Sequence, residues 1–212
     1  AVLGRCLDSV RQVADEIVVV DTGSSDRTAA IAAEHGARVG TFAWQDDFAA
    51  ARNASLELAT KGWILWLDAD EYLPEAACQR VQQLKSTAPD RAFFFELVNE
   101  GAERSRFRQV KMFPRRDEIR FQRPVHETVL PALRRCGIGL ELAGVQVRHT
   151  GYADLQTTRR KTARYLGLME SWLEAHPDDH AVRFRVGHSH YQLGDRAAAQ
   201  RAFDAVLAAP SG

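Results

Sequence analysis

Acidic residues directly follow two apolar segments of the chain. Ile17–Val20 runs into Asp21, and Trp63–Leu67 runs into the acidic stretch Asp68–Glu71. Because open α/β sheets bind ligands beyond the carboxyl ends of their strands, we expect both acidic segments to face one crevice. Oxygen ligands on a short loop suit Mg²⁺ or Mn²⁺, and Mg²⁺ commonly takes one or two carboxylates together with substrate phosphates. The pattern therefore predicts a divalent-cation site after the second segment, at Asp68 and Asp70.

Glu71 has a second interpretation. Acidic side chains are favoured near helix N-termini, and Pro74 is expected to begin a helix that runs to about Ser86. Either a site role or a helix-terminal role fits this residue.

Two further segments of the first half could contact a phosphorylated ligand. The small residues of Thr22–Ser25, Ser24 among them, allow backbone N–H groups to approach a ligand closely, although such a loop can also simply turn and cap the next helix. Arg52 lies in an alanine-rich helix and could brace a pyrophosphate or a carboxylate. The alternative for Arg52 is a solvent-facing position on that helix.

The second half offers a base and another metal ligand. A pair such as His126-Glu127 could remove a proton from an attacking hydroxyl, and His149, after an apolar strand segment, could ligate a metal through a neutral imidazole. A satisfied or exposed histidine is the alternative for both. His176, His180, His188 and His190 of the tail are expected to be surface or packing residues.

The elements that must position these groups follow an α/β pattern. Strands are expected at 17–20, 38–42 and 63–67, alternating with helices at 28–35 and 47–60, which favours a parallel sheet in this half. Gly36 stands at a helix C-cap position, and Asp47 is a suitable N-cap. From Ala92 to Val147 the pattern changes to strands at 93–98, 107–113 and 140–147 with loops between them. These strands are expected to make the sheet mixed.

The chain becomes helical beyond Gly151. Helices are expected at 158–175, 181–192 and 195–208, with Gly194 in a short turn, and such an antiparallel pair is the unit of helical repeats. We therefore expect two domains, residues 1–152 and 153–212. Apolar residues at helical spacing from Leu3, and a first residue that is not Met, predict a fragment with an upstream segment missing.

Composition excludes several functional classes. Lys plus Arg and Asp plus Glu both number 28, so the formal net charge is zero, which argues against a nucleic-acid partner and against a polybasic membrane anchor. No apolar run approaches the roughly 20 residues of a transmembrane helix. The three cysteines, Cys6, Cys78 and Cys136, suggest neither a disulfide framework nor a CxxC metal site. We expect a cytoplasmic, reducing compartment.

Taken together, three motifs resemble family 2 glycosyltransferases of the GT-A (nucleotide-diphosphosugar transferase) fold. They are IVVVDTGSSDRT (17–28), FAAARN (48–53) and WLDADE (66–71), and the resemblance covers roughly residues 1 to 151. It most resembles the bacterial branch that carries tetratricopeptide repeats, since Val186, Gly187, Gly194, Ala199 and Phe203 follow that repeat's pattern. This family normally begins with a strand ahead of the first helix seen here, so the resemblance implies a catalytic domain lacking its first strand and an incomplete donor pocket.

The resemblance implies a role for each candidate residue. Asp21 matches the acidic residue that contacts the nucleotide base or ribose, and Arg52 matches an arginine near the nucleotide. Asp68 and Asp70 match the DxD motif, with Asp70 as the metal ligand. Glu127 is the best match to the carboxylate base of inverting members, and His149 resembles a late histidine that completes the metal shell. The implied activity is transfer of a sugar from a nucleotide-diphosphate sugar to a protein, lipid or saccharide acceptor.

Two alternatives from other classes remain at this point. An apolar strand followed by Asp-x-Asp also introduces aspartyl-phosphate phosphatases, although Tyr72 stands where those enzymes usually have Thr or Val. A non-catalytic module is the other alternative, in which the helical tail binds a protein partner.

Overall fold

The computed structural model describes residues 2–100, 105–150 and 155–209, which fall into two compact units. The first unit comprises residues 1–122 and 127–152, and the second comprises residues 123–126 and 153–212. The domain boundary expected between 152 and 153 lies outside the described residues.

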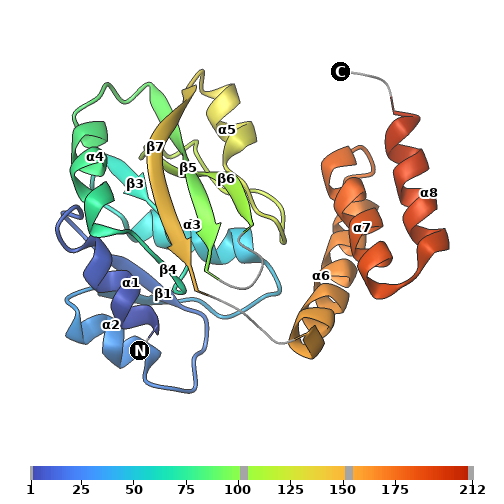
Figure 1. The fold of residues 1–212 in the computed structure, drawn as a ribbon, viewed down its shortest axis with the longest axis horizontal. Helices are drawn as coiled ribbons and strands as arrows, with labels where there is room; N and C mark the ends of the chain where they lie inside the picture. Colours follow the sequence, from blue (N-terminus) through green and yellow to red (C-terminus); the bar gives the residue numbers. More distant parts are fainter. Residues whose placement is uncertain (1, 101–104, 151–154, 210–212) are drawn as a thin grey trace. The chain divides into compact units, whose positions relative to one another are not determined.

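The first unit alternates helices and strands in its first half and is strand-rich in its second (Figure 1). The predicted helices and strands are found within a few residues of their expected ends. In chain order they are α1 (Val2–Val10), β1 (Val18–Asp21), α2 (Thr28–Glu34), β2 (Arg38–Thr41), α3 (Phe48–Leu58), β3 (Trp63–Leu65), β4 (Glu71–Tyr72), α4 (Glu75–Lys85), β5 (Arg91–Asn99), β6 (Arg106–Pro114), α5 (Leu130–Arg135) and β7 (Gly139–His149).

The strands form a mixed arrangement. One sheet has the order β3-β6-β5-β7-β4 and is antiparallel except for the parallel pair β5–β7, whereas β1 and β2 form a separate parallel pair. The expectation that the first-half strands share one parallel sheet is therefore wrong. An apolar strand segment buried on both faces is compatible with either strand direction, and here β3 pairs antiparallel with β6, with Trp63 opposite Pro114.

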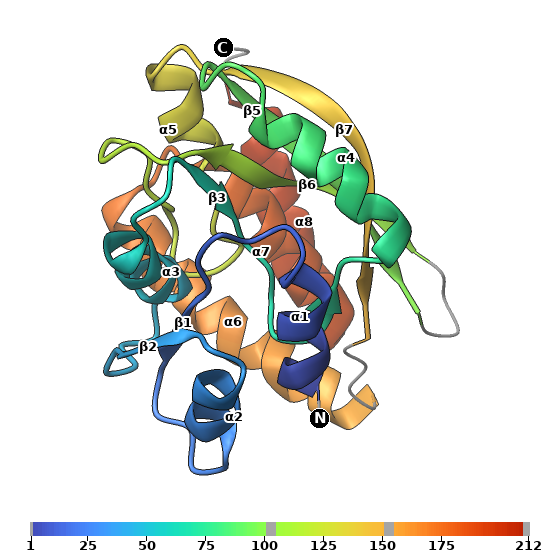
Figure 2. The same cartoon turned by 90° about the vertical axis from the view of Figure 1, so that its left-hand side faces the viewer.

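Two apolar layers cover the two faces of the five-stranded sheet. Helices α3 and α5 pack on one face, and α1 and α4 on the other (Figure 2). Along β3 the side chains alternate between the layers: Ile64 joins the first, while Trp63 and Leu65 join the second. The α/β class with helices on both faces of a mixed sheet is confirmed.

A cavity of about 470 Å³ lies between β1 and β3. Its walls include Val18–Val20 of β1, Trp63–Leu65 of β3, and Leu7 and Val10 of α1. Strand β1 is hydrogen-bonded to β2, and β3 to β6, but β1 and β3 are not neighbours in either sheet. The apolar sequence of β1 is typical of a fully buried strand. Because β3 does not pair with it, the residues of β1 are only half-buried.

Two short elements were not predicted. Helix α5 has Pro131 in its first turn and two arginines in its last, which are ordinary helix signals in a segment read as a loop. Strand β4 is only two residues long and pairs with the end of β7, placing Glu71 opposite His149. Glu71 therefore lies in a strand rather than at a helix N-terminus.

In the second unit the described residues form α6 (Leu155–Ala175), α7 (His180–Leu193) and α8 (Arg196–Leu207). Asp179 caps α7 by accepting from the Val182 N–H at 3.1 Å, and Asp195 caps α8 by accepting from the Ala198 N–H at 2.9 Å. Gly194 takes the left-handed conformation, φ +96°, that ends α7 and allows the tight turn. In the same unit, Arg123 forms a two-pronged ion pair with Asp179, at 2.8 and 2.9 Å.

Within the residues that the structure describes, no helix combines the length and apolar character needed to cross a membrane. All three cysteines are free thiols, which agrees with the expectation that they form no disulfide framework.

Candidate functional site

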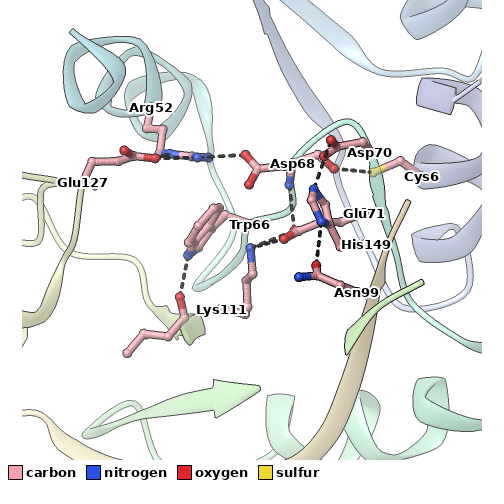
Figure 3. A network of polar contacts seen from close by, with 11 residues as sticks. Cys6, Arg52, Trp66, Asp68, Asp70, Glu71, Asn99, Lys111, Glu127 and His149 are labelled. Atoms are coloured by element: carbon pink, nitrogen blue, oxygen red, sulfur yellow. Dashed lines mark hydrogen bonds and ion pairs between the residues drawn. The ribbon is translucent and has the colours of Figure 1, made fainter. Parts of the chain in front are cut away.

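The turn Asp68–Ala69–Asp70 joins the end of the β3 segment to β4. Its ends are fixed by backbone hydrogen bonds: the Glu71 N–H donates to the Asp68 carbonyl at 2.9 Å, and the Thr150 N–H donates to the Asp70 carbonyl at 2.9 Å. The two carboxylates leave the turn toward different partners (Figure 3). The sequence-predicted pair is thus held on a rigid turn between two strands.

Arg52 joins Asp68 to the candidate base. Its Nη2 donates to Asp68 Oδ1 at 2.8 Å, and its Nε donates to Glu127 Oε1 at 2.6 Å. The guanidinium also lies over the ring of Trp66, 4.2 Å from its centroid. Arg52 therefore faces the site rather than solvent.

These ion pairs set the charges of the group. Although burial opposes ionisation of Asp68, the nearby Arg52 guanidinium keeps the pKa of that carboxyl below its ordinary value. Burial likewise opposes the charge on Arg52, and the carboxylates of Asp68 and Glu127 outweigh it and raise the pKa of the guanidinium. The three side chains thus form a compact charged cluster with one cation and two anions.

Asp70 lies next to His149, the other residue expected to be a metal ligand. His149 Nε2 lies 3.1 Å from Asp70 Oδ2, and its Nδ1 lies 2.8 Å from the Oδ1 of Asn99. That Asn99 oxygen can only accept, so Nδ1 donates to it, and Nε2 must carry a second proton to donate to the Asp70 carboxylate. The hydrogen bond between the two side chains lowers the pKa of Asp70 and raises that of His149.

The donor set fits a cation that takes part of its coordination from substrate. In the described part of the chain, no group of three or more His, Cys, Asp or Glu side chains could hold a metal alone. Asp70 and His149 supply one oxygen and one nitrogen side by side, and Mg²⁺ commonly uses one or two protein carboxylates completed by phosphates and water. Asp70 and His149 therefore fit a divalent cation only where water or a bound molecule completes its coordination.

Asp21 and Ser24 lie in a local turn. The Ser24 N–H donates to Asp21 Oδ1 at 3.0 Å. Hydrogen bonds from the Ser24 side chain and from this N–H lower the pKa of Asp21. Thr22, between them, lines the cavity together with Arg52 and Asp68. The loop after β1 thus borders the same cavity as the Asp68 turn.

Sequence reasoning missed the buried residues behind the turn. Lys111 of β6 is fully buried and pairs with Glu71, which is 1% exposed; Nζ lies 2.7 Å from Oε2 of that carboxylate. Asn99, which orients His149, was also missed. The only signal for Lys111 was a lysine between Val110 and Met112 in an apolar strand segment, since lysine is rarely buried without a partner.

Cys6 also lies beside the Asp68–Asp70 turn. Its thiol donates to the Asp68 carbonyl at 3.5 Å (Figure 3), and burial, together with the carboxylates of Glu71 and Asp68, raises the pKa of the thiol to about 12. Cys6 is therefore a neutral packing residue.

Known proteins resemble this chain in sequence. Residues 1–137 match the model of Glycosyl transferase family 2. The TPR repeat-containing protein Synpcc7942_0270 of Synechococcus elongatus is 41% identical over 94% of this chain and 51% of its own length. The SPbeta prophage-derived glycosyltransferase SunS of Bacillus subtilis is 25% identical over 86% of this chain and 44% of its own length. The chain thus spans about half the length of these curated relatives.

Solved structures share the fold at low sequence identity. S. aureus TarS 1-349, in complex with UDP-GlcNAc, aligns with a TM-score of 0.61 at 12% identity, covering 97% of this chain and 76% of that one. The mannosyltransferase PcManGT of Pyrobaculum calidifontis, in complex with GDP-Man and Mn²⁺, aligns with a TM-score of 0.56 at 16% identity, covering 100% and 72%. These likenesses establish a GT-A fold.

The family match covers more than half of the chain and includes all three motifs that carry the resemblance. It is at odds with a phosphatase and with a purely non-catalytic module. The chain belongs to glycosyl transferase family 2.

Proposed function

We propose that this chain is the catalytic part of a metal-dependent glycosyltransferase that moves a sugar from a nucleotide-diphosphate sugar, a UDP-sugar, to an acceptor hydroxyl with inversion. One observation carries the proposal: Arg52 bridges the carboxylates of Asp68 and Glu127, while His149 lies against the carboxylate of Asp70. The solved complexes of TarS with UDP-GlcNAc and of PcManGT with GDP-Man and Mn²⁺ support this choice of donor and metal.

Asp70 and His149 would hold a Mn²⁺ or Mg²⁺ ion. Such an ion, when bound, supplies Lewis-acid stabilisation of the charge on the departing diphosphate. Asp21, Ser24, Arg52 and Asp68 are the proposed contacts of the nucleotide sugar.

Glu127 is the proposed general base. It takes the proton of the acceptor hydroxyl as the acceptor oxygen bonds to the anomeric carbon and the bond to the diphosphate oxygen breaks. A single displacement of this kind inverts the anomeric centre. Arg52 orients Glu127 through Oε1 and places positive charge where negative charge accumulates on the leaving group.

We further propose that residues 1–152 form a GT-A domain in which the cavity between β1 and β3 has room for one more strand. The free edges of these two strands and the apolar lining of the cavity support it. Hydrogen exchange tests it: amides on the facing edges of β1 and β3 should exchange faster than amides of β5, and slow exchange there would contradict it.

The tail, residues 153–212, is proposed to hold one tetratricopeptide-like repeat and to present a surface for a protein partner. The relative named as a TPR repeat-containing protein supports the repeat. The acceptor class stays open between protein, lipid and saccharide. No nucleic acid is expected among the partners, and a cytoplasmic location remains a prediction from the cysteines.

Asp70→Ala tests the central proposal. UDP release and sugar transfer from UDP-sugars are measured with Mn²⁺ for the wild type and the variant. We expect the variant to keep its circular dichroism spectrum and lose metal-dependent transfer. Wild-type turnover by Asp70→Ala would overturn the assignment, whereas phosphate release from small phosphoesters would revive the phosphatase.

A further inference from the structure

A buried ion pair between Lys111 and Glu71 lies behind the Asp68–Asp70 turn. Lys111 Nζ lies 2.7 and 3.0 Å from the two carboxylate oxygens of Glu71. The exposed fractions are 0% for Lys111 and 1% for Glu71, so both charges are withdrawn from water. Figure 3 shows the pair between Trp66 and the turn.

Glu71 uses one of these oxygens to hold the turn. Its Oε2 accepts from the Asp68 N–H at 2.9 Å, while its own N–H donates to the Asp68 carbonyl at 2.9 Å. Residues 68 and 71 are thus tied by reciprocal hydrogen bonds. The direction in which the Asp68 and Asp70 side chains leave the turn is fixed by this closure.

Lys111 is itself fixed from two sides. The Trp66 N–H donates to the Lys111 carbonyl at 3.0 Å, and the Lys111 ammonium lies 3.5 Å from the centroid of the Trp66 ring. The indole N–H of Trp66 donates to the Val110 carbonyl at 2.7 Å, which anchors the ring on β6. The ammonium therefore reaches Glu71 from a rigid position in the five-stranded sheet.

Stability alone does not explain such a pair. Well-packed apolar residues of similar volume often match or exceed a buried ion pair in stability, because desolvating two charges is costly. An apolar pair here would leave the Asp68 N–H without the acceptor that Glu71 provides. The ion pair instead keeps the Glu71 carboxylate in position to accept from the Asp68 N–H.

We propose that Lys111 is a positioning residue, which holds the Glu71 carboxylate against the Asp68 amide and thereby aims Asp68 at Arg52 and Asp70 at His149. This inference rests on the proposed function, since the turn matters as the donor and cation site. Lys111 touches neither substrate nor cation in this role and acts through Glu71.

Three variants separate the contributions of charge and geometry. Lys111→Met leaves the Glu71 carboxylate buried without its partner. Lys111→Met/Glu71→Gln removes both charges and keeps an amide oxygen for the Asp68 N–H. Lys111→Met/Glu71→Met removes both charges and that acceptor while keeping the packing. Lys85→Met is the control, because it removes a lysine from an ion pair with Asp15 at 2.6 Å elsewhere in the same unit.

Binding of Mn²⁺ alone to the full chain, followed by electron paramagnetic resonance, is the first readout. Losing support behind a ligand typically costs about 10–100-fold in metal affinity. We expect that loss in Lys111→Met/Glu71→Met while the variant stays folded, and recovery to within about threefold of wild type in Lys111→Met/Glu71→Gln, by the same reasoning. Lys85→Met should leave Mn²⁺ affinity unchanged. Wild-type Mn²⁺ affinity in Lys111→Met/Glu71→Met would overturn the inference.

Exchange of the Asp68 amide is the second readout and does not depend on metal. It should accelerate in Lys111→Met/Glu71→Met and stay slow in Lys111→Met/Glu71→Gln. If the wild-type protein binds no Mn²⁺ but the variants show this exchange pattern, the proposed function is contradicted and the positioning role of Lys111 is retained. Slow exchange in all variants would overturn the positioning role itself, and the double variants decide the matter even where Lys111→Met fails to fold.

Discussion

Arg52 Nε lies 2.6 Å from Glu127 Oε1, although the two residues are 75 positions apart in the chain. The same guanidinium reaches Asp68 Oδ1 at 2.8 Å. The carboxylate proposed as the base and the first aspartate of the Asp68–Asp70 turn therefore share one cation. Any movement of Arg52 changes the position of both.

Replacing Arg52 by lysine should uncouple these carboxylates. A lysine keeps the charge but cannot present the planar fork that binds two carboxylates at fixed angles. Misplacement of reacting groups by about 1 Å can cost about 100-fold in rate, so we expect kcat/KM for sugar transfer to fall by about that factor in Arg52→Lys. Arg38→Lys, at an exposed position of β2, is the control. Equal transfer rates in the two variants would argue against the shared role.

Glu127→Gln should separate binding from proton removal. The glutamine oxygen can still accept from Arg52, so UDP and Mn²⁺ should bind with wild-type affinity in calorimetric titrations. Loss of a general base typically slows the reaction by about 100- to 10,000-fold, and we expect the transfer rate to fall within that range. A variant that transfers sugar at the wild-type rate would assign the base to another residue.

Much of the first unit could be predicted because its signals are local. The Asp47 cap, Gly36 at φ +78° and the acidic residues after β3 are each encoded within a few neighbouring positions. The acidic turn at Asp68 and Asp70 followed from placing acidic residues at strand ends, whereas the roles of Arg52 and His149 near it came from the resemblance. The structure brings these side chains within hydrogen-bonding distance.

What could not be predicted depends on the pairing of distant segments. Strand β4 exists because Glu71 and Tyr72 pair with the end of β7, nearly 80 residues away. The partnership of Lys111 with Glu71 depends on the register of β3 against β6, and Asn99 reaches His149 only because β5 runs beside β7. No local pattern specifies such registers, since each side chain alone is compatible with several positions.

The stability of the second unit should depend on pH through Asp179. Burial opposes its ionisation, but hydrogen bonds from Arg123 and from the Val182 N–H lower its pKa below the ordinary 3.8. A carboxyl with a lowered folded-state pKa stabilises the fold above its ordinary pKa, and this stabilisation is lost as pH falls through the lowered value. Asp179→Asn should therefore destabilise α7 by about 1.5–3 kcal/mol at pH 6.

Hydrogen exchange of the α7 amides measures that difference. The gap between wild type and Asp179→Asn should shrink as the pH is lowered below 3.8. Asp195→Asn, at the exposed cap of α8, is the control and should show a smaller effect at every pH. A gap that stays constant down to the acid limit would mean that the charge of Asp179 is not involved.

Two glycines of the second unit should respond to alanine in opposite directions. A Cβ at Gly187 of α7 would lie 2.7 Å from Phe203 Cε1 and 2.8 Å from its Cδ1, whereas a Cβ at Gly167 of α6 meets nothing within 4 Å. Overpacking costs about 1–3 kcal/mol, so Gly187→Ala should destabilise the α7–α8 pair by that amount. Gly167→Ala should stabilise α6 by about 0.5–1 kcal/mol, because alanine is the better helix former.

Urea unfolding with exchange readout in each helix measures both changes, and Gly187→Ala/Phe203→Leu should recover part of the loss. If Gly187→Ala were as stable as Gly167→Ala, the close contact between α7 and α8 that the proposed tetratricopeptide-like repeat requires would be absent.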